Sequence, residues 1–199
     1  VKHARKHMRK WMRPERRPLD FPLGLLGARA QIEYQPKGVV GIVAPWNFPV
    51  FLTYGPVAAA LAAGNRCMVK GSEFTPLTSQ LMSDLAHKYF AQDEVFFVNG
   101  GPEVGQAFTS LPFDHILFTG ATGIGRHVMR AAAENLVPVT LELGGKSPVI
   151  VGRSTDMKFV ASRVAMGKTL NAGQICLAPD YVIAPREKEQ ELVDASVQS

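Results

Sequence analysis

The stretch Val39-Val-Gly-Ile-Val-Ala44 is a short apolar run rich in β-branched residues, and a helical pattern over 50–63 follows it. A run of this kind predicts a β-strand. The same alternation of strand and helix continues down the chain. Further strands are predicted over 66–70, 95–98, 115–119 and 137–141, and further helices over 76–89, 103–109 and 124–134.

Strands and helices that alternate at this spacing indicate an α/β fold, a doubly wound parallel sheet with helices on both faces. Ligands of such sheets bind beyond the carboxyl ends of the strands. An alternating segment over 28–35 predicts one arm of a hairpin, and the run from Tyr181 to Ala184 predicts one more strand. The pattern contains no internal repeat and no low-complexity tract.

The composition is that of an ordinary globular protein. The chain has 199 residues, of which 46% are apolar, enough for one domain and part of another. No apolar run approaches the roughly 20 residues that span a bilayer. The N-terminus has no stretch of secretory-signal type, and only two cysteines occur, so we expect a reducing cytoplasm. The five histidines form no metal-like cluster with cysteine, and no metal site is expected.

The positive charge is concentrated at the start of the chain. Residues 1–17 hold eight Lys and Arg and one Glu, a net +7, so the remainder carries −2 of the total +5. Ala4, Met8, Trp11 and Met12 fall at helical spacing among these charges, which predicts an amphipathic helix with a solvated polar face and no nucleic-acid partner. An arm that binds nucleic acid or an anionic surface is the alternative.

The stretch Leu170-Asn-Ala-Gly-Gln-Ile-Cys-Leu-Ala-Pro179 places one thiol in a segment too rich in Gly, Asn and Pro for the middle of a helix or strand. Cys176 is therefore expected on a reachable loop. An isolated cysteine is more often an inert small hydrophobe, and Cys67, which enters a predicted strand, is interpreted in that way. The motifs upstream of Cys176 favour a nucleophile at that position.

Four motifs occur in a fixed order: Pro-Trp-Asn-Phe-Pro over 45–49, Phe-Thr-Gly over 118–120, Glu-Leu-Gly-Gly-Lys over 142–146 and Gly-Gln-Ile-Cys over 173–176. In these motifs and their order the chain resembles the aldehyde dehydrogenase superfamily. The ending Cys-Leu-Ala-Pro-Asp-Tyr is similar to the class 3-like branch, and most similar to the bacterial coniferyl aldehyde dehydrogenase group. The resemblance implies an NAD(P)-dependent enzyme that oxidises an aldehyde to the carboxylic acid.

The cofactor prediction is spread over several strand ends. The turn Gly120-Ala-Thr-Gly-Ile-Gly125 follows a predicted strand and opens a helix, where backbone N–H groups favour a phosphate. Glu73 can accept both hydroxyls of a ribose beside Lys70, although a surface ion pair is the alternative. NAD is the expected cofactor and NADP the alternative. The resemblance implies this cofactor-binding set: Trp46, Lys70, Glu73, Gly120, Ala121, Thr122, Gly123, Ile124, Gly125 and Leu143.

Two positions depart from the family pattern. Gly71 stands where the family often has Pro, so a looser turn is expected there. Ala121 stands where many members have Ser, so one hydroxyl contact to the cofactor is expected to be missing.

The resemblance also implies the catalytic roles. Cys176 is the nucleophile that forms a thiohemiacetal and then a labile thioester. Asn47 and the Cys176 backbone N–H are expected to stabilise the oxyanion, with a role as a turn former between two prolines as the alternative for Asn47. Glu142, 34 residues before Cys176, is the expected general base, its pKa raised by partial desolvation beside Leu141 and Leu143.

The expected organisation is a basic helix and linker over 1–27, an NAD(P)-binding domain with a hairpin arm over 28–145, and the start of a second α/β catalytic domain over 146–199. The family's later Glu-x-Phe-Gly-Pro segment does not occur, so the chain is interpreted as a fragment with little or no turnover by itself. A small aldehyde, aromatic or medium-chain, is the expected substrate, and the intact enzyme is expected to be a homodimer. A catalytically inactive protein with the same fold is the competing hypothesis.

Overall fold

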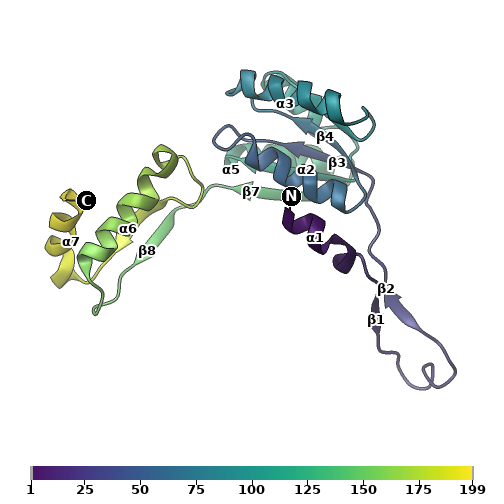
Figure 1. The fold of residues 1–199 in the computed structure, drawn as a ribbon, viewed down its shortest axis with the longest axis horizontal. Helices are drawn as coiled ribbons and strands as arrows, with labels where there is room; N and C mark the ends of the chain where they lie inside the picture. Colours follow the sequence, from purple (N-terminus) through teal and green to yellow (C-terminus); the bar gives the residue numbers. More distant parts are fainter. Residues whose placement is uncertain (1, 199) are drawn as a thin grey trace. The chain divides into compact units, whose positions relative to one another are not determined.

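The structure is a computed structural model that describes residues 2–198. The chain divides into two compact units, one ending at Glu142 and the other beginning at Leu143 (Figure 1). Each unit has a hydrophobic core of its own.

A five-stranded parallel sheet forms the centre of the first unit, with the strand order β5-β4-β3-β6-β7. The central strand β3 pairs with β4 and with β6, so that Val40 lies opposite Cys67 on one side and His115 on the other. The predicted parallel α/β sheet is thereby confirmed. The strands are β3 (Val39–Val43), β4 (Arg66–Lys70), β5 (Val95–Val98), β6 (His115–Gly120) and β7 (Val139–Leu143).

Helices connect these strands and cover both faces of the sheet. They are α2 (Phe51–Ala62), α3 (Pro76–Tyr89), α4 (Pro102–Thr109) and α5 (Thr122–Ala133). The chain runs from β3 outward to β5 and then returns to β6 on the other side of β3. Because crossovers between parallel strands are right-handed, this reversal places α2 and α3 on one face and α4 and α5 on the other.

The core under α2 and α3 is made of buried aliphatic and aromatic side chains together with one cysteine. Its members are Val40, Ile42, Val57, Cys67, Val69, Met82, Ala86, Val95 and Phe97. Full burial of one such large apolar side chain stabilises the fold by about 1.5–3 kcal/mol. Cys67 is only 3% exposed, and its predicted role in core packing is confirmed. Burial raises the pKa of its thiol to about 11, so this thiol stays protonated and unreactive near neutral pH.

Two elements of the first unit begin two residues away from the sequence prediction. Helix α5 begins at Thr122, two residues before the predicted start, because Ala121 is extended and its carbonyl already accepts a hydrogen bond from Gly125 N at 2.9 Å. Strand β7 covers Val139–Leu143, two residues later than predicted. In the chain before it, Leu136 has a positive φ of 54°, which interrupts an extended backbone. Helices α3 and α4 begin with a proline, whose fixed φ suits the first helical position.

The N-terminal segment forms α1 (Lys2–Trp11) and a hairpin of β1 (Glu15–Arg17) with β2 (Ala30–Ile32). The hairpin extends away from the sheet of the first unit (Figure 1). The arm predicted over 28–35 is thus a strand, and its antiparallel partner lies in the segment predicted to be a linker. Ala4 and Met8 of α1 line an apolar hollow against α2, whereas Trp11 and Met12 are half exposed, so only part of the predicted apolar side faces the protein.

The second unit is a strand, helix, strand arrangement followed by a further helix. Strands β8 (Ser147–Ile150) and β9 (Pro179–Ile183) are parallel, and α6 (Met157–Thr169) with a short 3-10 turn η1 (Leu170–Gly173) connects them. The 3-10 turn η2 (Arg186–Lys188) and α7 (Glu189–Val197) follow. The sequence predicted only β9 among these elements. Asp156 caps α6, with its Oδ1 accepting from Lys158 N at 2.9 Å.

Candidate active site

Three loops meet at one edge of the sheet in the first unit. Strands β3, β4 and β6 are parallel neighbours, so their carboxyl ends lie at the same edge. The loops that follow carry Trp46 with Asn47, Lys70 with Glu73, and the turn over 120–125. Strands β3 and β6 are adjacent, but the helices that follow them cover opposite faces, and ligands of doubly wound sheets bind at such a point.

The loop after β3 presents Trp46 and Asn47 before α2 begins. Trp46 is 44% exposed, and Asn47 is half-buried. The preceding Pro45 is buried and anchors the start of this loop. The loop therefore offers an aromatic surface and a polar side chain at the edge where the other two loops end.

The loop after β4 holds an ion pair in which one partner, Lys70, is buried. Lys70, the last residue of β4, is 3% exposed, and its Nζ donates to Glu73 Oε2 at 2.6 Å. The Glu73 side chain is 34% exposed. Partial burial by itself raises the pKa of Glu73. The hydrogen bond from Lys70, a backbone hydrogen bond and the Lys70 charge lower it, and together they outweigh burial. The pKa of Glu73 therefore lies below its ordinary value. The pair differs from one between two exposed side chains because Lys70 is buried, and the ribose role of Glu73 stays a prediction.

The turn that contains Gly71 is closely packed rather than loose. A Cβ on Gly71 would lie 2.6 Å from Ser79 Oγ and 3.0 Å from Asn99 Oδ1. Ser79 Oγ in turn donates to the Ser72 carbonyl at 3.1 Å. The expectation of a looser turn was wrong, because Gly71 lets α3 approach the end of β4.

The turn from β6 into α5 has the geometry of an anion site. Gly120 ends β6, Ala121 precedes the helix, and no side chain caps the first turn of α5. Ala121, Thr122, Gly123 and Ile124 are exposed, whereas Gly125 is buried. Free backbone N–H groups at the start of a 12-residue helix favour a phosphate.

Glu142 lies near the end of β7 and is exposed. Strand β7 is at the edge of the sheet, and its residues alternate between half-buried and exposed, which turns Thr140 and Glu142 outward. The predicted desolvation of Glu142 beside Leu141 and Leu143 is therefore wrong for this chain, since both leucines point to the other side of the strand. Leu143 is half-buried.

Cys176 lies in the second unit, on the loop between η1 and β9, and its thiol is free and exposed. Exposure agrees with the reachable loop predicted from the sequence. Asn171, Ala172 and Gly173 precede it in left-handed conformations, with φ values of 50°, 54° and 76°. A left-handed alanine is uncommon and strained. No residue pattern predicts this conformation at Ala172, because only asparagine and glycine in this run favour it.

The predicted residues are thus distributed over both units. Asn47, the cofactor candidates up to Gly125 and Glu142 belong to the first unit, and Leu143 and Cys176 belong to the second. The joint action of Cys176 with Asn47 and Glu142 stays a prediction. Among residues 2–198, no group of three or more His, Cys, Asp or Glu side chains has the arrangement of a metal site. Within the same range, no helix combines the length and apolar character needed to cross a bilayer.

Comparison with known proteins gives the same assignment along the whole chain. Residues 1–199 match the sequence profile of the aldehyde dehydrogenase family. A probable coniferyl aldehyde dehydrogenase of Caulobacter vibrioides is 64% identical over 171 residues, which cover 86% of this chain and 35% of that protein. A coniferyl aldehyde dehydrogenase of a Pseudomonas species is 59% identical over 167 residues, 84% of this chain and 35% of that protein.

Solved structures show the same relationship. A substrate-bound Staphylococcus aureus AldH superposes with a TM-score of 0.93 at 40% identity, covering 99% of this chain and 43% of that one. A Mycobacterium tuberculosis aldehyde dehydrogenase in complex with NAD+ superposes with a TM-score of 0.88 at 34% identity, covering 99% and 40%. The chain spans about a third of the length of the curated relatives it matches. On sequence and fold alike, the chain belongs to the aldehyde dehydrogenase family.

Proposed function

We propose that the protein containing this chain oxidises an aldehyde to the carboxylic acid with NAD(P)+, and that Cys176 is its nucleophile. The observation that carries the proposal is the edge of the first unit's sheet, where Asn47, the Lys70–Glu73 pair and the uncapped start of α5 follow adjacent parallel strands. The similarity to aldehyde dehydrogenases over the whole chain supports it.

The residues at this edge fit a dinucleotide. The free N–H groups at the start of α5 suit a pyrophosphate, and a Cβ on Gly123 would meet no atom within 4 Å, so the backbone there is open to a ligand. Glu73 is ionised and held by Lys70, which suits the two hydroxyls of a ribose. A dinucleotide held by these residues would supply the hydride acceptor for the oxidation of the Cys176 thiohemiacetal to the thioester. We propose NAD as the preferred cofactor, because the Glu73 carboxylate repels a 2′-phosphate.

The chemistry of the chain's own residues follows from the thiol. The Cys176 thiolate forms a bond to the carbonyl carbon, and the carbonyl electron pair moves to the oxygen. Asn47 and the Cys176 backbone N–H donate to that oxyanion, each worth a few kcal/mol in related acyl transfers. After oxidation to the thioester, Glu142 takes a proton from a water molecule. That water attacks the acyl carbon, the C–S bond breaks, and the acid leaves with the thiolate restored.

The finer assignments rest on the relatives. Two of the curated relatives are a coniferyl and a probable coniferyl aldehyde dehydrogenase, and we propose an aromatic aldehyde of that type as the substrate.

The β1–β2 hairpin extends from the first unit as an arm suited to a second subunit (Figure 1), and we propose a homodimer. One free exposed thiol and one buried thiol fit a reducing compartment, and we place the protein in the cytoplasm.

The test uses the full-length protein with coniferyl aldehyde, benzaldehyde, hexanal and acetaldehyde, each with NAD and with NADP. Cys176→Ser is expected to lower kcat/KM by about 10³-fold or more, with no burst of reduced cofactor. Glu142→Gln is expected to keep the burst and to lower the steady-state rate about 10²- to 10⁴-fold, because only hydrolysis needs the base. Oxidation that neither substitution changes would refute the mechanism, and a wild-type protein without activity on any aldehyde would favour an inactive homologue.

A further inference from the structure

The segment that follows Glu142 and the segment that follows Cys176 enter the same two-stranded sheet of the second unit. Strand β8 begins at Ser147, five residues after Glu142, and strand β9 begins at Pro179, three residues after Cys176. The two strands are parallel, and Ser147 is the Cα partner of Pro179. Both segments therefore reach the sheet side by side, at the amino ends of its strands.

An ion pair joins the two segments at this entry. Lys146 directly precedes β8, and its Nζ donates to Asp180 Oδ1 at 3.3 Å and lies 3.2 Å from Asp180 Oδ2. Lys146 follows Glu142 by four residues, and Asp180 follows Cys176 by four residues. Four residues of extended chain span at most about 14 Å. A displacement of the pair can therefore act on each proposed catalytic residue over a short length of chain.

A β-bulge sets the position of Asp180. The partner of Ser147 is Pro179, but the partner of the next residue, Pro148, is Tyr181. Asp180 is thus an extra residue of β9 without a Cα partner in β8. Bulges are rare between parallel strands, and they redirect side chains and are frequent next to active sites. The ladder is interrupted at the residue whose carboxylate meets Lys146.

The Cys176 loop is held by packing as well as by the ion pair. Ala178 is buried, and its N–H donates to the Ile175 carbonyl at 3.0 Å. A Cβ on Gly167 of α6 would lie 3.2 Å from ring atoms of Pro179, so α6 packs closely on the start of β9. The position of this loop therefore depends only in part on Asp180.

The segment after Glu142 has less to hold it. Gly144 and Gly145 lie outside every strand and helix, and a Cβ on either would meet no atom within 4 Å. Lys146 is the first residue after these glycines, and its ion pair attaches the end of the segment to β9. We therefore expect loss of the pair to free the Glu142 segment more than the Cys176 loop.

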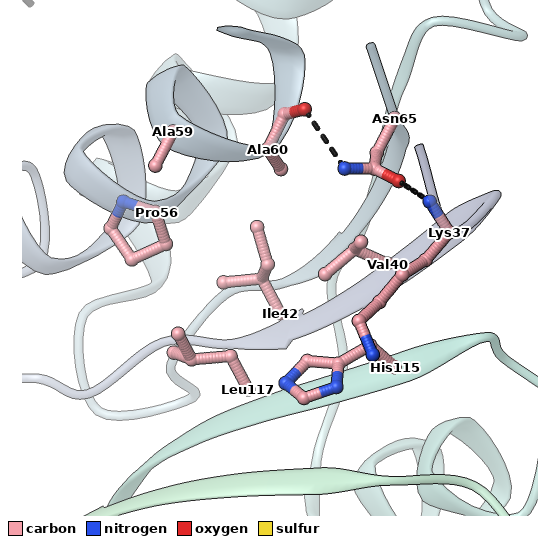
Figure 2. Close-up of a pocket in the computed structure, with 9 residues that line it drawn as sticks. All are labelled: Lys37, Val40, Ile42, Pro56, Ala59, Ala60, Asn65, His115 and Leu117. Atoms are coloured by element: carbon pink, nitrogen blue, oxygen red, sulfur yellow. Dashed lines mark hydrogen bonds between the residues drawn. The ribbon is translucent and has the colours of Figure 1, made fainter. Parts of the chain in front are cut away.

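Stability alone does not account for an exposed pair at this place. In the first unit, a neutral side chain joins two parallel strands at their amino ends: Asn65 directly precedes β4, and its Oδ1 accepts from Lys37 N, just before β3, at 2.6 Å (Figure 2). In the second unit the Lys146 side chain is 81% exposed and that of Asp180 32%. Exposed ion pairs contribute little to stability, so the position of this pair between the two segments is its more informative property.

We propose that Lys146 and Asp180 are positioning residues for hydrolysis of the thioester on Cys176. The inference rests on the proposed function and adds two residues to it. In that step a water oxygen bonds to the acyl carbon, the C–S bond breaks, and a proton of the water passes to Glu142. The pair takes no part in these bond changes and acts through the segment that carries Glu142. Formation of the thioester does not need that base, so loss of the pair slows hydrolysis more than oxidation.

The test measures the two steps separately in the full-length protein, with the aldehyde of the panel above that is oxidised fastest. Reduced cofactor formed in a single turnover, with enzyme in excess, reports oxidation. Decay of the acyl adduct on Cys176, followed by mass spectrometry of quenched samples, reports hydrolysis. Lys146→Met removes the charge from a side chain of similar length and is expected to slow hydrolysis about 10-fold and oxidation less than about 3-fold. Asp180→Asn is expected to have the same effect.

Two controls separate positioning from a general loss of stability. The double variant Lys146→Asp with Asp180→Lys restores the pair with reversed charges and is expected to hydrolyse the adduct within about 3-fold of the wild-type rate. Arg153→Met removes an exposed pair of 2.9 Å with Glu187, which lies beyond the carboxyl ends of β8 and β9, and is expected to leave both rates unchanged.

The outcomes that overturn the positioning role are equal slowing of both steps by Lys146→Met, equal slowing of hydrolysis by Arg153→Met, and no recovery in the double variant. Oxidation that persists in Cys176→Ser refutes the proposed function and the positioning role together. Normal hydrolysis in Lys146→Met beside an inactive Cys176→Ser overturns the positioning role alone.

Discussion

Removing the charge of Glu73 by Glu73→Gln is expected to destabilise the first unit, because the buried Lys70 ammonium loses its counter-charge at 2.6 Å. Breaking a fully buried pair costs about 3–5 kcal/mol. The Glu73 side chain is 34% exposed, so water screens the remaining charge, and glutamine still offers a carbonyl oxygen to Lys70. We therefore expect a loss of about 1–2 kcal/mol in the free energy of unfolding.

The assay is urea unfolding of the 199-residue chain followed by tryptophan fluorescence. Both tryptophans, Trp11 and Trp46, lie in the first unit, so the signal reports on that unit alone and avoids a two-domain transition. Asp93→Asn is the matched control, because the exposed pair of Asp93 with Arg66 spans 3.8 Å at the same unit's surface. That control is expected to change the unfolding free energy by less than about 0.5 kcal/mol.

The pH dependence gives a second readout. The pKa of Glu73 is lower in the folded chain than its ordinary value of 4.5. The contribution of ionised Glu73 to the free energy of unfolding is therefore fully present above pH 4.5. It is lost as the pH falls through the lower pKa of the folded chain. The difference between wild type and Glu73→Gln is expected to hold at neutral pH and to shrink below about pH 4.5. An unfolding free energy of Glu73→Gln that matches that of Asp93→Asn at pH 7 would refute the account of the buried pair.

Three further outcomes follow from the packing. Gly71→Ala is expected to cost about 1–3 kcal/mol in the same fluorescence assay, because its Cβ would lie 2.6 Å from Ser79 Oγ; an unchanged midpoint would contradict the close packing of that turn. Alkylation of the native chain near neutral pH is expected to label Cys176 and leave Cys67 unmodified until the chain unfolds, as read by mass spectrometry, because burial raises the Cys67 pKa to about 11. Ala172→Gly is expected to stabilise the second unit by up to about 1 kcal/mol in circular dichroism melts, because Ala172 has a φ of 54°. The control Ala165→Gly, inside α6, is expected to destabilise it by about 1 kcal/mol. A change of the same sign in both variants would rule out strain at Ala172.

The local elements of the first unit were readable from the sequence. Strand β4 and helix α3 occur at the predicted residues, and β3, α2 and α4 end within one residue of their predicted limits. Cys67 was assigned to the core and Cys176 to an accessible loop from the residues around them, and both assignments hold. These features depend on periodicity and on Gly and Pro signals, which act within a few residues of the chain.

The features that only the tertiary structure decided depend on distant neighbours. The sequence left the Lys70–Glu73 pair open between a surface pair and a site. Lys70 is buried, and a Cβ on Gly105 of α4 would lie 3.9 Å from its Cε. The sequence placed Glu142 in an apolar surrounding, but the position of β7 at the sheet edge exposes it. The pairing of β3 with β6 brings the Asn47 loop beside the turn over 120–125, although more than seventy residues separate them. Burial and strand order are set by contacts between segments far apart in the chain, and local residue patterns contain no record of those contacts.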